Sequence, residues 1–373
     1  MSLLKRAVLV TYPNQFILQE AKELAKAAGY EVVEVLTQRY LMHSKYGLGS
    51  GKAEELKEIV AKRGCNVILF DESLKSVQIY NLTKLTGVEI IDREKLILEI
   101  FAKRASSRES KLQVRLAELE YEMARAKEKV RLAKLGEQPG FYGLGGYEVD
   151  VYYRAIKRMT TSIKEKLMKV RKHRELYRQR RLKLGMPTIS LAGYTGAGKT
   201  TLFNLLTQED KEVSNSAFTT LTTSTRSITL PHGKALLSDT VGFISRLPTY
   251  MIEAFKATLE EMTYANLVLL LLDSSDPPAE LRRKYESCTK ILSEIGVPIE
   301  KTLTIYNKAD LCSREEIEEK VKTLPTDINE AVFISAKTGK GLKILTDLID
   351  ARLFSTQELP KKALVDIRRL AET

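Results

Sequence analysis

Residues 193–200 read Gly-Tyr-Thr-Gly-Ala-Gly-Lys-Thr, and this glycine-rich run constrains the fold more than any other stretch of the chain. It follows residues 186–192, which end in an apolar stretch typical of a buried strand, and it precedes residues 201–207, whose apolar spacing is helical. This order of strand, tight turn and helix leaves backbone N–H groups free at the helix N-terminus. These groups and the helix dipole favour the binding of an anion there. The spacing G-x-x-x-x-G-K-T therefore predicts a loop that binds nucleotide phosphates.

The residues of this loop have distinct expected roles. Lys199 is expected to reach the β- and γ-phosphates, and the Thr200 hydroxyl to ligate Mg²⁺. Glycine at positions 193 and 198 permits a turn that a side chain would obstruct. The residues expected to contact the nucleotide here are Gly193, Tyr194, Thr195, Gly196, Ala197, Gly198, Lys199, Thr200 and Thr201.

A second pattern, Asp239-Thr-Val-Gly242, follows the strand-like residues 234–238. Asp239 is expected to hold Mg²⁺ through water, and the Gly242 N–H to sense the γ-phosphate. A threonine from the intervening loop must also close on Mg²⁺, and within residues 218–223 we choose Thr220. The predicted catalytic residues are Lys199, Thr220 and Gly242, and the predicted metal ligands are Thr200, Thr220 and Asp239.

A third pattern, Asn-Lys-Ala-Asp at residues 307–310, can recognise guanine. An ionised Asp310 accepts hydrogen bonds only, so it can take both the ring N–H and the amino group of guanine. Adenine lacks that donor pair, and a buried acceptor facing it would lose ~1–3 kcal/mol. The residues expected to complete the guanine site are Asn307, Lys308, Asp310, Ser335, Ala336 and Lys337. The three patterns, in this order, predict a Ras-like P-loop domain that binds GTP.

The chain of 373 residues carries a net charge of +12, and this excess is confined to its middle. Residues 1–102 hold 14 basic and 13 acidic side chains, and residues 184–373 hold 23 and 25. Residues 103–183 hold 23 and 10, a net charge of +13. Such an asymmetry indicates a charged partner and says little about the fold.

The same middle segment has the clearest helical pattern. Apolar residues step by four and three in an unbroken a/d heptad pattern at Leu112, Leu116, Leu119, Met123, Ala126 and Val130. The pattern repeats at Ile156, Thr160, Ile163, Leu167 and Val170. The glycine-rich residues 136–146 between them cannot continue a helix, so an antiparallel helical hairpin is predicted for residues 102–183.

The end of the second helix, residues 166–183, carries nine basic residues and one acid. A solvated helix face is the ordinary explanation, but this imbalance beside a GTP site favours nucleic acid, with strongly salt-dependent binding. An acidic membrane surface fits less well because no apolar anchor face accompanies the charge. The predicted RNA-binding residues are Lys166, Lys169, Arg171, Lys172, Arg174, Arg178, Arg180 and Arg181.

Residues 1–101 alternate strand-like and helix-like segments, which predicts a parallel α/β domain. Within it, residues 47–52 read Gly-Leu-Gly-Ser-Gly-Lys and superficially resemble a nucleotide loop, but they lack the full spacing. A capped loop, an RNA phosphate contact and a second nucleotide site all stay open there. The predicted division is thus 1–101, 102–183, a GTPase domain at 184–355 and a tail at 356–373.

Other features of the sequence narrow the class of protein. No apolar stretch approaches the ~20 residues of a membrane span, and no signal-peptide pattern begins the chain. Cys65, Cys288 and Cys312 are isolated, which suits free thiols in a reducing cytoplasm. We expect a cytoplasmic protein, with a monomer favoured.

The chain resembles the HflX family of ribosome-associated GTPases, within the Obg–HflX-like group, to about residue 355. The matching stretches are residues 110–119, 170–174, 193–204, 239–244, 247–248 and 254–261. The resemblance implies binding to the large ribosomal subunit, stimulated GTP hydrolysis there and, in several members, dissociation of ribosomes under stress.

Three positions bear on that resemblance. The family's glycine-rich tip is usually longer, and residues 145–148 keep only part of it. Gly196 stands where many members have an Asn that related GTPases use to ligate K⁺, which argues against potassium activation. Phe243 occupies the place of the water-orienting Gln of Ras-like enzymes, a feature the family shares.

Phosphoryl transfer depends on positioning and charge stabilisation, and Phe243 cannot orient water. We therefore predict slow intrinsic hydrolysis to GDP and phosphate, stimulated by a partner, in a protein that works as a switch. Two other classes stay open. One is a GTPase of rRNA maturation or tRNA modification, and the other is a non-catalytic GTP-binding scaffold.

Overall fold

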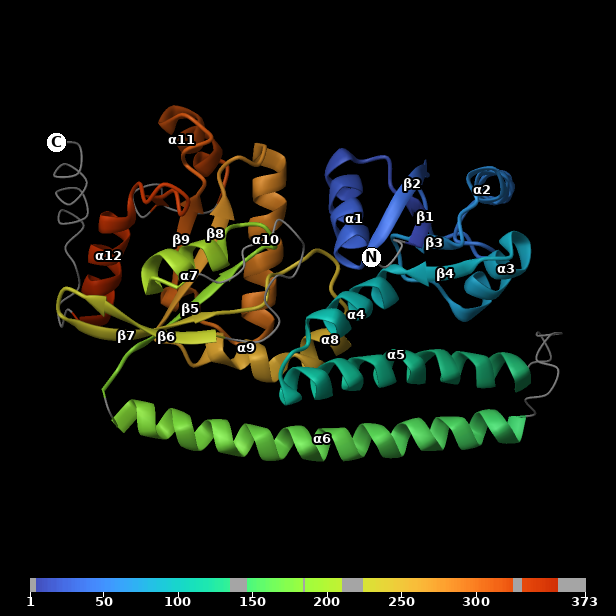
Figure 1. Ribbon diagram of the computed structural model, residues 1–373, viewed down its shortest axis with the longest axis horizontal. Coiled ribbons are helices and arrows are strands. Elements are labelled where there is room, and N and C mark those ends of the chain that lie inside the picture. The colour runs from blue at the N-terminus through green and yellow to red at the C-terminus, as the bar shows by residue number, and fades with distance from the viewer. Residues whose placement is uncertain (1–4, 135–145, 184, 210–223, 325–330, 355–373) are drawn as a thin grey trace. The chain divides into compact units, whose positions relative to one another are not determined.

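The computed structural model describes residues 5–134, 146–183, 185–209, 224–324 and 331–354 (Figure 1). The chain divides into two compact units. The first comprises Met1–Val170 together with Pro248–Ala254, and the second comprises Arg171–Leu247 and Phe255–Thr373. A short segment from the later half of the sequence therefore belongs to the first unit.

The first unit is built on a four-stranded parallel sheet in the order β2-β1-β3-β4. Its strands are β1 (Lys5–Thr11), β2 (Tyr30–Thr37), β3 (Val67–Phe70) and β4 (Glu89–Asp92). Its first helices are α1 (Gln15–Ala27), α2 (Ser50–Arg63), α3 (Ser76–Thr86) and α4 (Arg93–Arg104). Strands joined in parallel by helices confirm the predicted α/β fold of this part of the chain.

Local signals explain where these helices begin and end. The Asn14 side chain caps α1 by accepting hydrogen bonds from the backbone N–H groups of Phe16 and Ile17. The Asp92 carboxylate caps α4 in the same way through Lys95 N–H. The loop at residues 47–52 leads directly into α2, whose N-cap is Gly49 and whose cap makes no side-chain hydrogen bond.

Charged side chains are buried at the carboxyl ends of β1, β3 and β4. Arg93 is 3% exposed, and it donates to Asp71 Oδ1 at 2.5 Å and also pairs with Glu20. Thr11 Oγ1 donates to Asp71 Oδ2 at 2.7 Å. Burial lowers the pKa of Arg93, but the carboxylates of Asp71 and Glu20 outweigh it and leave this pKa raised. The guanidinium is thus held charged inside the unit.

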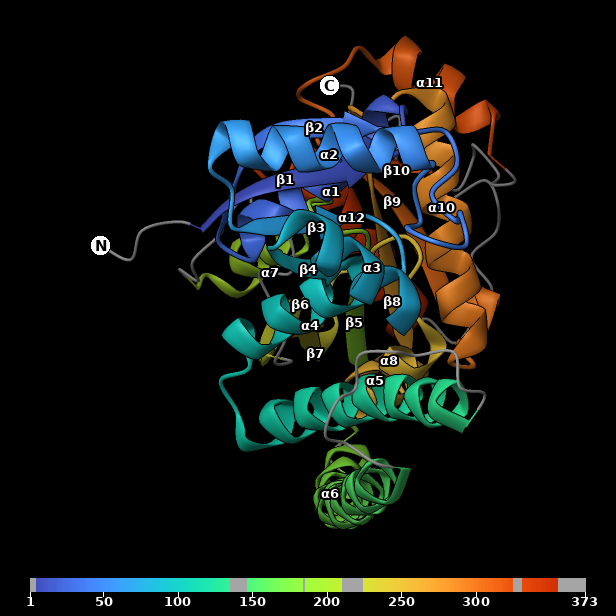
Figure 2. The same cartoon turned by 90° about the vertical axis from the view of Figure 1, so that its right-hand side faces the viewer.

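Two long helices, α5 (Arg108–Lys134) and α6 (Gly146–Lys183), lie side by side (Figures 1 and 2). Lys164 Nζ on α6 lies 2.9 Å from Glu120 Oε1 on α5. Leu116, Leu119 and Ala126 are buried on α5, as the heptad pattern predicts. The glycine-rich tip at 136–146 falls almost entirely outside the described residues.

The buried face of α5 is wider than a two-helix seam. Gln113, Val114 and Ala117 are also buried, whereas the predicted core residues Leu112 and Met123 are only partly so. The reason is that α5 packs against α3, α4 and α8 (Thr249–Ala254) as well as lying beside α6. A helix covered on several sides buries residues outside a strict a/d stripe.

Helix α8 is the part of the first unit that comes from later in the chain. Tyr250 Oη donates to Glu94 Oε2 at 2.8 Å, and Met251 is fully buried. Burial and the Glu94 carboxylate raise the pKa of the Tyr250 hydroxyl well above its usual range. Near this contact, Arg125 of α5 donates to Asp92 Oδ2 at 2.5 Å. Helix α8 therefore packs beside α4 and α5 next to a group of polar contacts that these helices share.

The second unit holds a six-stranded sheet in the order β10-β9-β8-β5-β7-β6, in which only β6 and β7 pair antiparallel. Its strands are β5 (Thr188–Gly193), β6 (Ser224–Leu230), β7 (Gly233–Asp239), β8 (Leu267–Asp273), β9 (Thr302–Asn307) and β10 (Val332–Phe333). Its helices are α7 (Lys199–Thr207), α9 (Lys256–Thr263), α10 (Pro278–Glu294), α11 (Arg314–Lys322) and α12 (Leu342–Phe354), with a 3₁₀ turn, η1, at Ile299–Lys301. Residues 267–272 form the buried central strand that their continuous apolar run predicts.

The core of this unit joins strands to helices on one face of the sheet. Ile189, Leu191 and Leu269 of the strands pack with Phe203 of α7 and Leu345 of α12. Across the described residues, no helix is long and apolar enough to cross a membrane.

The buried ion pairs of the first unit make a testable prediction about stability. Asp71→Ala leaves Arg93 charged and buried without the more deeply buried of its two carboxylate partners, which costs about 3–5 kcal/mol. The matched control Glu34→Ala removes a partner of the exposed Arg63 and costs about 0–1 kcal/mol. Hydrogen exchange of the β1 and β3 amides in the full chain measures both, because it reports on this unit alone. Equal losses in the two variants would contradict the account.

Candidate active site

The three sequence patterns of the second unit meet at one edge of its sheet. β5 ends at Gly193, β7 at Asp239, β8 at Asp273 and β9 at Asn307. These strands are parallel, so their carboxyl ends lie along the same edge, where open α/β sheets bind ligands. The fold thus gathers residues that are more than 100 positions apart in the sequence.

The glycine-rich loop takes the conformation that its sequence predicts, between β5 and the N-terminus of α7. Gly198 has φ 93°, and a Cβ placed there would lie 2.2 Å from Asn307 Nδ2. Only glycine fits this position, because both the backbone conformation and the neighbouring amide exclude a side chain.

Lys199 lies beneath this loop, 7% exposed. Its Nζ donates to the carbonyl oxygens of Gly193 and Tyr194 at 2.9 Å each. Burial lowers the pKa of Lys199 to about 8, and the Asp239 carboxylate opposes the shift only in part. Two of its three donors are held by the loop, which aims the ammonium along one direction.

Thr200 and Asp239 bring two oxygen donors together. Thr200 Oγ1 donates to Asp239 Oδ2 at 3.0 Å, and both residues are buried. Hydroxyl, carboxylate and phosphate oxygens with water are the ligands that Mg²⁺ prefers, so the chemistry of this pair fits a magnesium ion. Thr220, the third expected ligand, lies at residues 210–223, outside the described residues.

Asn307 connects the phosphate loop to the loop after β10. Its Nδ2 donates to Ala197 O at 2.8 Å, and its Oδ1 accepts from Ala336 N–H at 2.9 Å. Asn307 is 2% exposed, so neither side of its amide exchanges these partners for water. One side chain therefore fixes the spacing between the predicted phosphate and base regions.

Asp310 lies at the surface of the site. A hydrogen bond from the Ser335 side chain holds the pKa of Asp310 below its usual range, so the carboxylate is ionised and acceptor-only at neutral pH. Lys308 adopts φ 65° and pairs with Asp273 Oδ2 at 2.5 Å. The sequence patterns did not identify Asp273, and its only signal is its place at the carboxyl end of β8.

The segment after Asp239 runs against the phosphate loop. Phe243 N–H donates to Gly193 O at 3.0 Å, and Thr195 N–H donates to Phe243 O at 2.8 Å. The Phe243 side chain is 2% exposed. At Gly242 an added Cβ would lie 2.9 Å from Thr195 Cγ2 and 3.0 Å from Lys199 Nζ. Gly242 therefore packs directly on the phosphate loop. Two backbone hydrogen bonds to that loop fix the position of Phe243, and its buried side chain is apolar.

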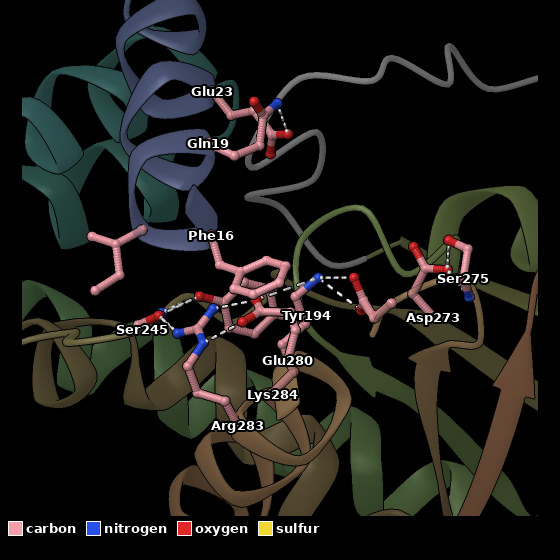
Figure 3. Close-up of polar contacts among 12 residues, drawn as sticks. Phe16, Gln19, Glu23, Tyr194, Ser245, Asp273, Ser275, Glu280, Arg283 and Lys284 are labelled. Carbon is pink, nitrogen blue, oxygen red and sulfur yellow. Dashed lines mark hydrogen bonds and ion pairs between the residues drawn. The ribbon is translucent and has the colours of Figure 1, made fainter. Parts of the chain in front are cut away.

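Sequence reasoning also missed the partners of Tyr194. Its hydroxyl accepts from Ser245 N–H at 2.6 Å and lies 2.6 Å from Ser245 Oγ. Arg283 and Lys284 of α10 place their cationic groups 5.5 and 5.3 Å from the centre of the Tyr194 ring (Figure 3). Ser245 lies 51 residues from Tyr194, and no short motif signals such a pairing.

A phosphate loop, a strand-end Asp-x-x-Gly and an Asn-Lys-x-Asp on one sheet edge define a P-loop GTPase. Three family descriptions match consecutive parts of the chain. They are "GTP-binding GTPase N-terminal" at residues 16–102, "GTP-binding GTPase Middle Region" at 104–181 and "50S ribosome-binding GTPase" at 188–308.

Curated relatives cover nearly the whole chain. GTPase HflX of Thermofilum pendens is 44% identical over 95% of this chain and 85% of its own length. GTPase HflX of Methanocaldococcus jannaschii is 44% identical over 89% and 82%, and that of Escherichia coli is 38% identical over 90% and 79%. The crystal structure of the SsGBP–GDP complex aligns with a TM-score of 0.52 at 28% identity, over 92% of this chain and 97% of that one. The chain belongs to the HflX family of GTPases, and it hydrolyses GTP.

The buried Lys199 makes nucleotide affinity depend on pH. The ammonium is half neutral near pH 8 in the ligand-free protein, and bound phosphates restore its charge. Binding therefore takes up a proton above that pH, and the GDP Kd is about fourfold higher at pH 8.5 than at pH 7. Calorimetry in buffers of different ionisation enthalpy measures the uptake directly. Binding without proton uptake at pH 8.5 would overturn the assignment.

Asp310 makes a prediction about the base. Asp310→Asn replaces one acceptor oxygen by a donor, which weakens GTP binding by about 10- to 100-fold and favours xanthosine triphosphate. The control Glu300→Gln changes an exposed carboxylate just before β9, at the opposite end from Asn307, and leaves both affinities unchanged. Competition against a fluorescent guanine nucleotide measures the affinities of each variant for GTP and for xanthosine triphosphate. Unchanged GTP affinity in Asp310→Asn would count against this residue as the guanine reader.

Proposed function

We propose that this GTPase is a switch that associates with the large ribosomal subunit. On its own it hydrolyses GTP slowly, and it hydrolyses GTP faster when it is bound to that subunit. The observation that carries the proposal is the set of exposed lysines Lys166, Lys169 and Lys172 in the basic part of α6. Support also comes from the GTPase domain's match to a family described as 50S ribosome-binding. A ribosomal partner implies a cytoplasmic site of action.

The exposed lysines of α6 are the core of the proposed RNA contact. Lys166, Lys169 and Lys172 are all exposed on the helix. Arg171 Nη2 lies 2.5 Å from Glu260 Oε1 within the second unit, so it already has a carboxylate partner. The side chains of Arg174, Arg178, Arg180 and Arg181 lie outside the described ones. Three lysines spaced along one helix can neutralise successive phosphates without reading the bases.

We assign the GTP chemistry to the residues at the sheet edge. Lys199 and the loop N–H groups neutralise the phosphates, and Gly242 N–H meets the γ-phosphate. Thr200 and Asp239, with Thr220, would hold Mg²⁺, which supplies charge stabilisation at the transferring phosphoryl group. We also propose the nucleotide contacts that the sequence predicts, namely residues 193–201, Asn307, Lys308, Asp310 and residues 335–337.

Phe243 explains why a partner is needed. A water-orienting side chain is missing at this position, and the Phe243 backbone is held by the phosphate loop. Intrinsic hydrolysis is therefore slow, and the partner supplies the missing group or orders the loop that carries Thr220.

The path of the chain supports a switch. Residues 239–247 belong to the second unit, and Pro248–Ala254 belong to the first, where Tyr250 bonds Glu94. Five residues separate Gly242 from Pro248. A rearrangement at the γ-phosphate therefore pulls on a helix that is packed against α5. We retain the division at residues 101 and 183 as the proposed domain organisation.

A GTPase of rRNA maturation or tRNA modification is the second candidate, because the exposed lysines would also suit free RNA. Chemical footprinting on intact subunits and on free rRNA distinguishes the two. Protection confined to intact large subunits supports the first, and protection of free RNA alone supports the second.

Sedimentation with purified large subunits tests the proposal. The wild-type chain is expected to co-sediment in a GTP-dependent, salt-sensitive way and to hydrolyse GTP faster than alone. Changing Lys166, Lys169 and Lys172 together to Glu abolishes binding at physiological salt, because three cations that pair with phosphates become anions that repel them. In the wild type these three contacts contribute about −2 to −3 to the slope of log affinity against log salt.

The matched control changes three exposed lysines of the second unit, Lys290, Lys301 and Lys322, to Glu. This control variant has the same net charge as the α6 variant. It is expected to bind large subunits, and to be stimulated by them, as the wild type is. An equal loss of binding in both triple variants would show that binding depends on net charge alone and not on the α6 lysines. If large subunits did not stimulate GTP hydrolysis by the wild type, the proposed partner would be refuted.

A further inference from the structure

The segment after Gly242 is fastened to the phosphate loop at two places. The first is the backbone pair between Phe243 and residues Gly193 and Thr195, with N···O distances of 3.0 and 2.8 Å. The second is the Tyr194 hydroxyl, which holds Ser245 by both its N–H and its Oγ at 2.6 Å. Phe243 and Tyr194 are buried. Two anchors two residues apart leave this segment little freedom.

Charged residues of α10 reinforce the second anchor (Figure 3). Arg283 Nη1 donates to Ser245 Oγ, and its Nη2 and Nε bond the two oxygens of Glu280 at 2.5 and 2.8 Å. Lys284 Nζ lies 2.8 Å from both oxygens of Asp276. Both cations also face the Tyr194 ring. A bidentate carboxylate pair fixes the guanidinium, so Ser245 is held by a group that does not itself swing freely.

The anchored arrangement opposes a γ-phosphate. The carbonyl oxygen of Phe243 accepts from the Thr195 N–H of the phosphate loop, so this N–H is occupied and cannot donate to a phosphate while the segment is closed. Gly242 packs on Lys199 so closely that an added Cβ would lie 3.0 Å from Nζ. The γ-phosphate that the proposed function assigns to Lys199 and Gly242 N–H needs space beside this contact, so we infer that its binding displaces the segment that follows Gly242. GDP lacks that phosphate and places no such demand.

We propose that Tyr194, with Ser245 and Arg283, forms a latch that makes the protein discriminate against GTP in favour of GDP. In this role Tyr194 is a positioning residue: its side chain stabilises the closed segment, and GTP binding must break that closure. The difference in affinity equals the free energy that the latch contributes to the closed state, because a ligand shifts an equilibrium only by its differential affinity. The latch deepens the proposed switch, but it concerns nucleotide affinity without any ribosome.

Tyr194→Phe tests the latch, because it keeps the ring that Arg283 and Lys284 face and removes only the hydroxyl. The readout is the ratio of the Kd for a non-hydrolysable β,γ-imido GTP analogue to the Kd for GDP, with Mg²⁺ and no ribosomes. This ratio is expected to fall by about fivefold to tenfold, as the loss of one or two hydrogen bonds allows. A ratio that is unchanged or higher would overturn the latch.

Two further variants sharpen the test. Ser245→Ala removes the Oγ but keeps the N–H, so it lowers the ratio less, and the double variant matches Tyr194→Phe alone because the residues act as a unit. Tyr285→Phe, the same change at a buried α10 tyrosine, leaves the ratio at the wild-type value. Additive effects, or an equal fall in Tyr285→Phe, would also contradict the latch. Failure of ribosome binding would leave these ratios untouched, so the two proposals fail separately.

Discussion

The two hydrogen bonds of the buried Asn307 side chain are the interaction on which the nucleotide site depends. They join the phosphate loop at Ala197 to the loop at Ala336, across a sheet whose parallel strands end at one edge. Gly198 is required because its backbone approaches this same amide. The predicted guanine and phosphate regions are therefore held at a fixed spacing by the protein itself, which reduces the ordering cost of nucleotide binding.

Against this rigid frame, the residues from Asp239 to Ala254 form the part that can change. Their first half is fastened to the phosphate loop through Phe243 and Ser245, and their second half is packed in the first unit through Tyr250 and Met251. Because this short segment is held at both ends, a displacement of its first half moves its second half as well. The chain itself thus joins Gly242, the proposed γ-phosphate contact, to α8 in the first unit within about a dozen residues, which is the kind of covalent connection that the proposed switch requires.

The sequence predicts what local patterns determine, namely the β-α-β order of the first sheet and, in the second unit, the strands and strand-end loops that carry the three nucleotide patterns. Those loops follow from apolar strands, glycine positions and capping residues within about ten positions. It does not predict that α8 packs in the first unit, that Asp273 holds Lys308, or that Tyr194 holds Ser245. These contacts join residues 35 to 156 positions apart, and no periodicity signals them. The wider buried face of α5 has the same origin, since α4 and α8 cover it too.

Hydrogen exchange of residues 239–254 in the GDP-bound and GTP-analogue-bound protein tests the central claim most directly. We expect the analogue to lower protection around Ser245 and also to change protection in α8, whose contacts lie in the first unit. A change limited to residues 239–247, with α8 identical in the two states, would show that the nucleotide signal does not leave the GTPase unit.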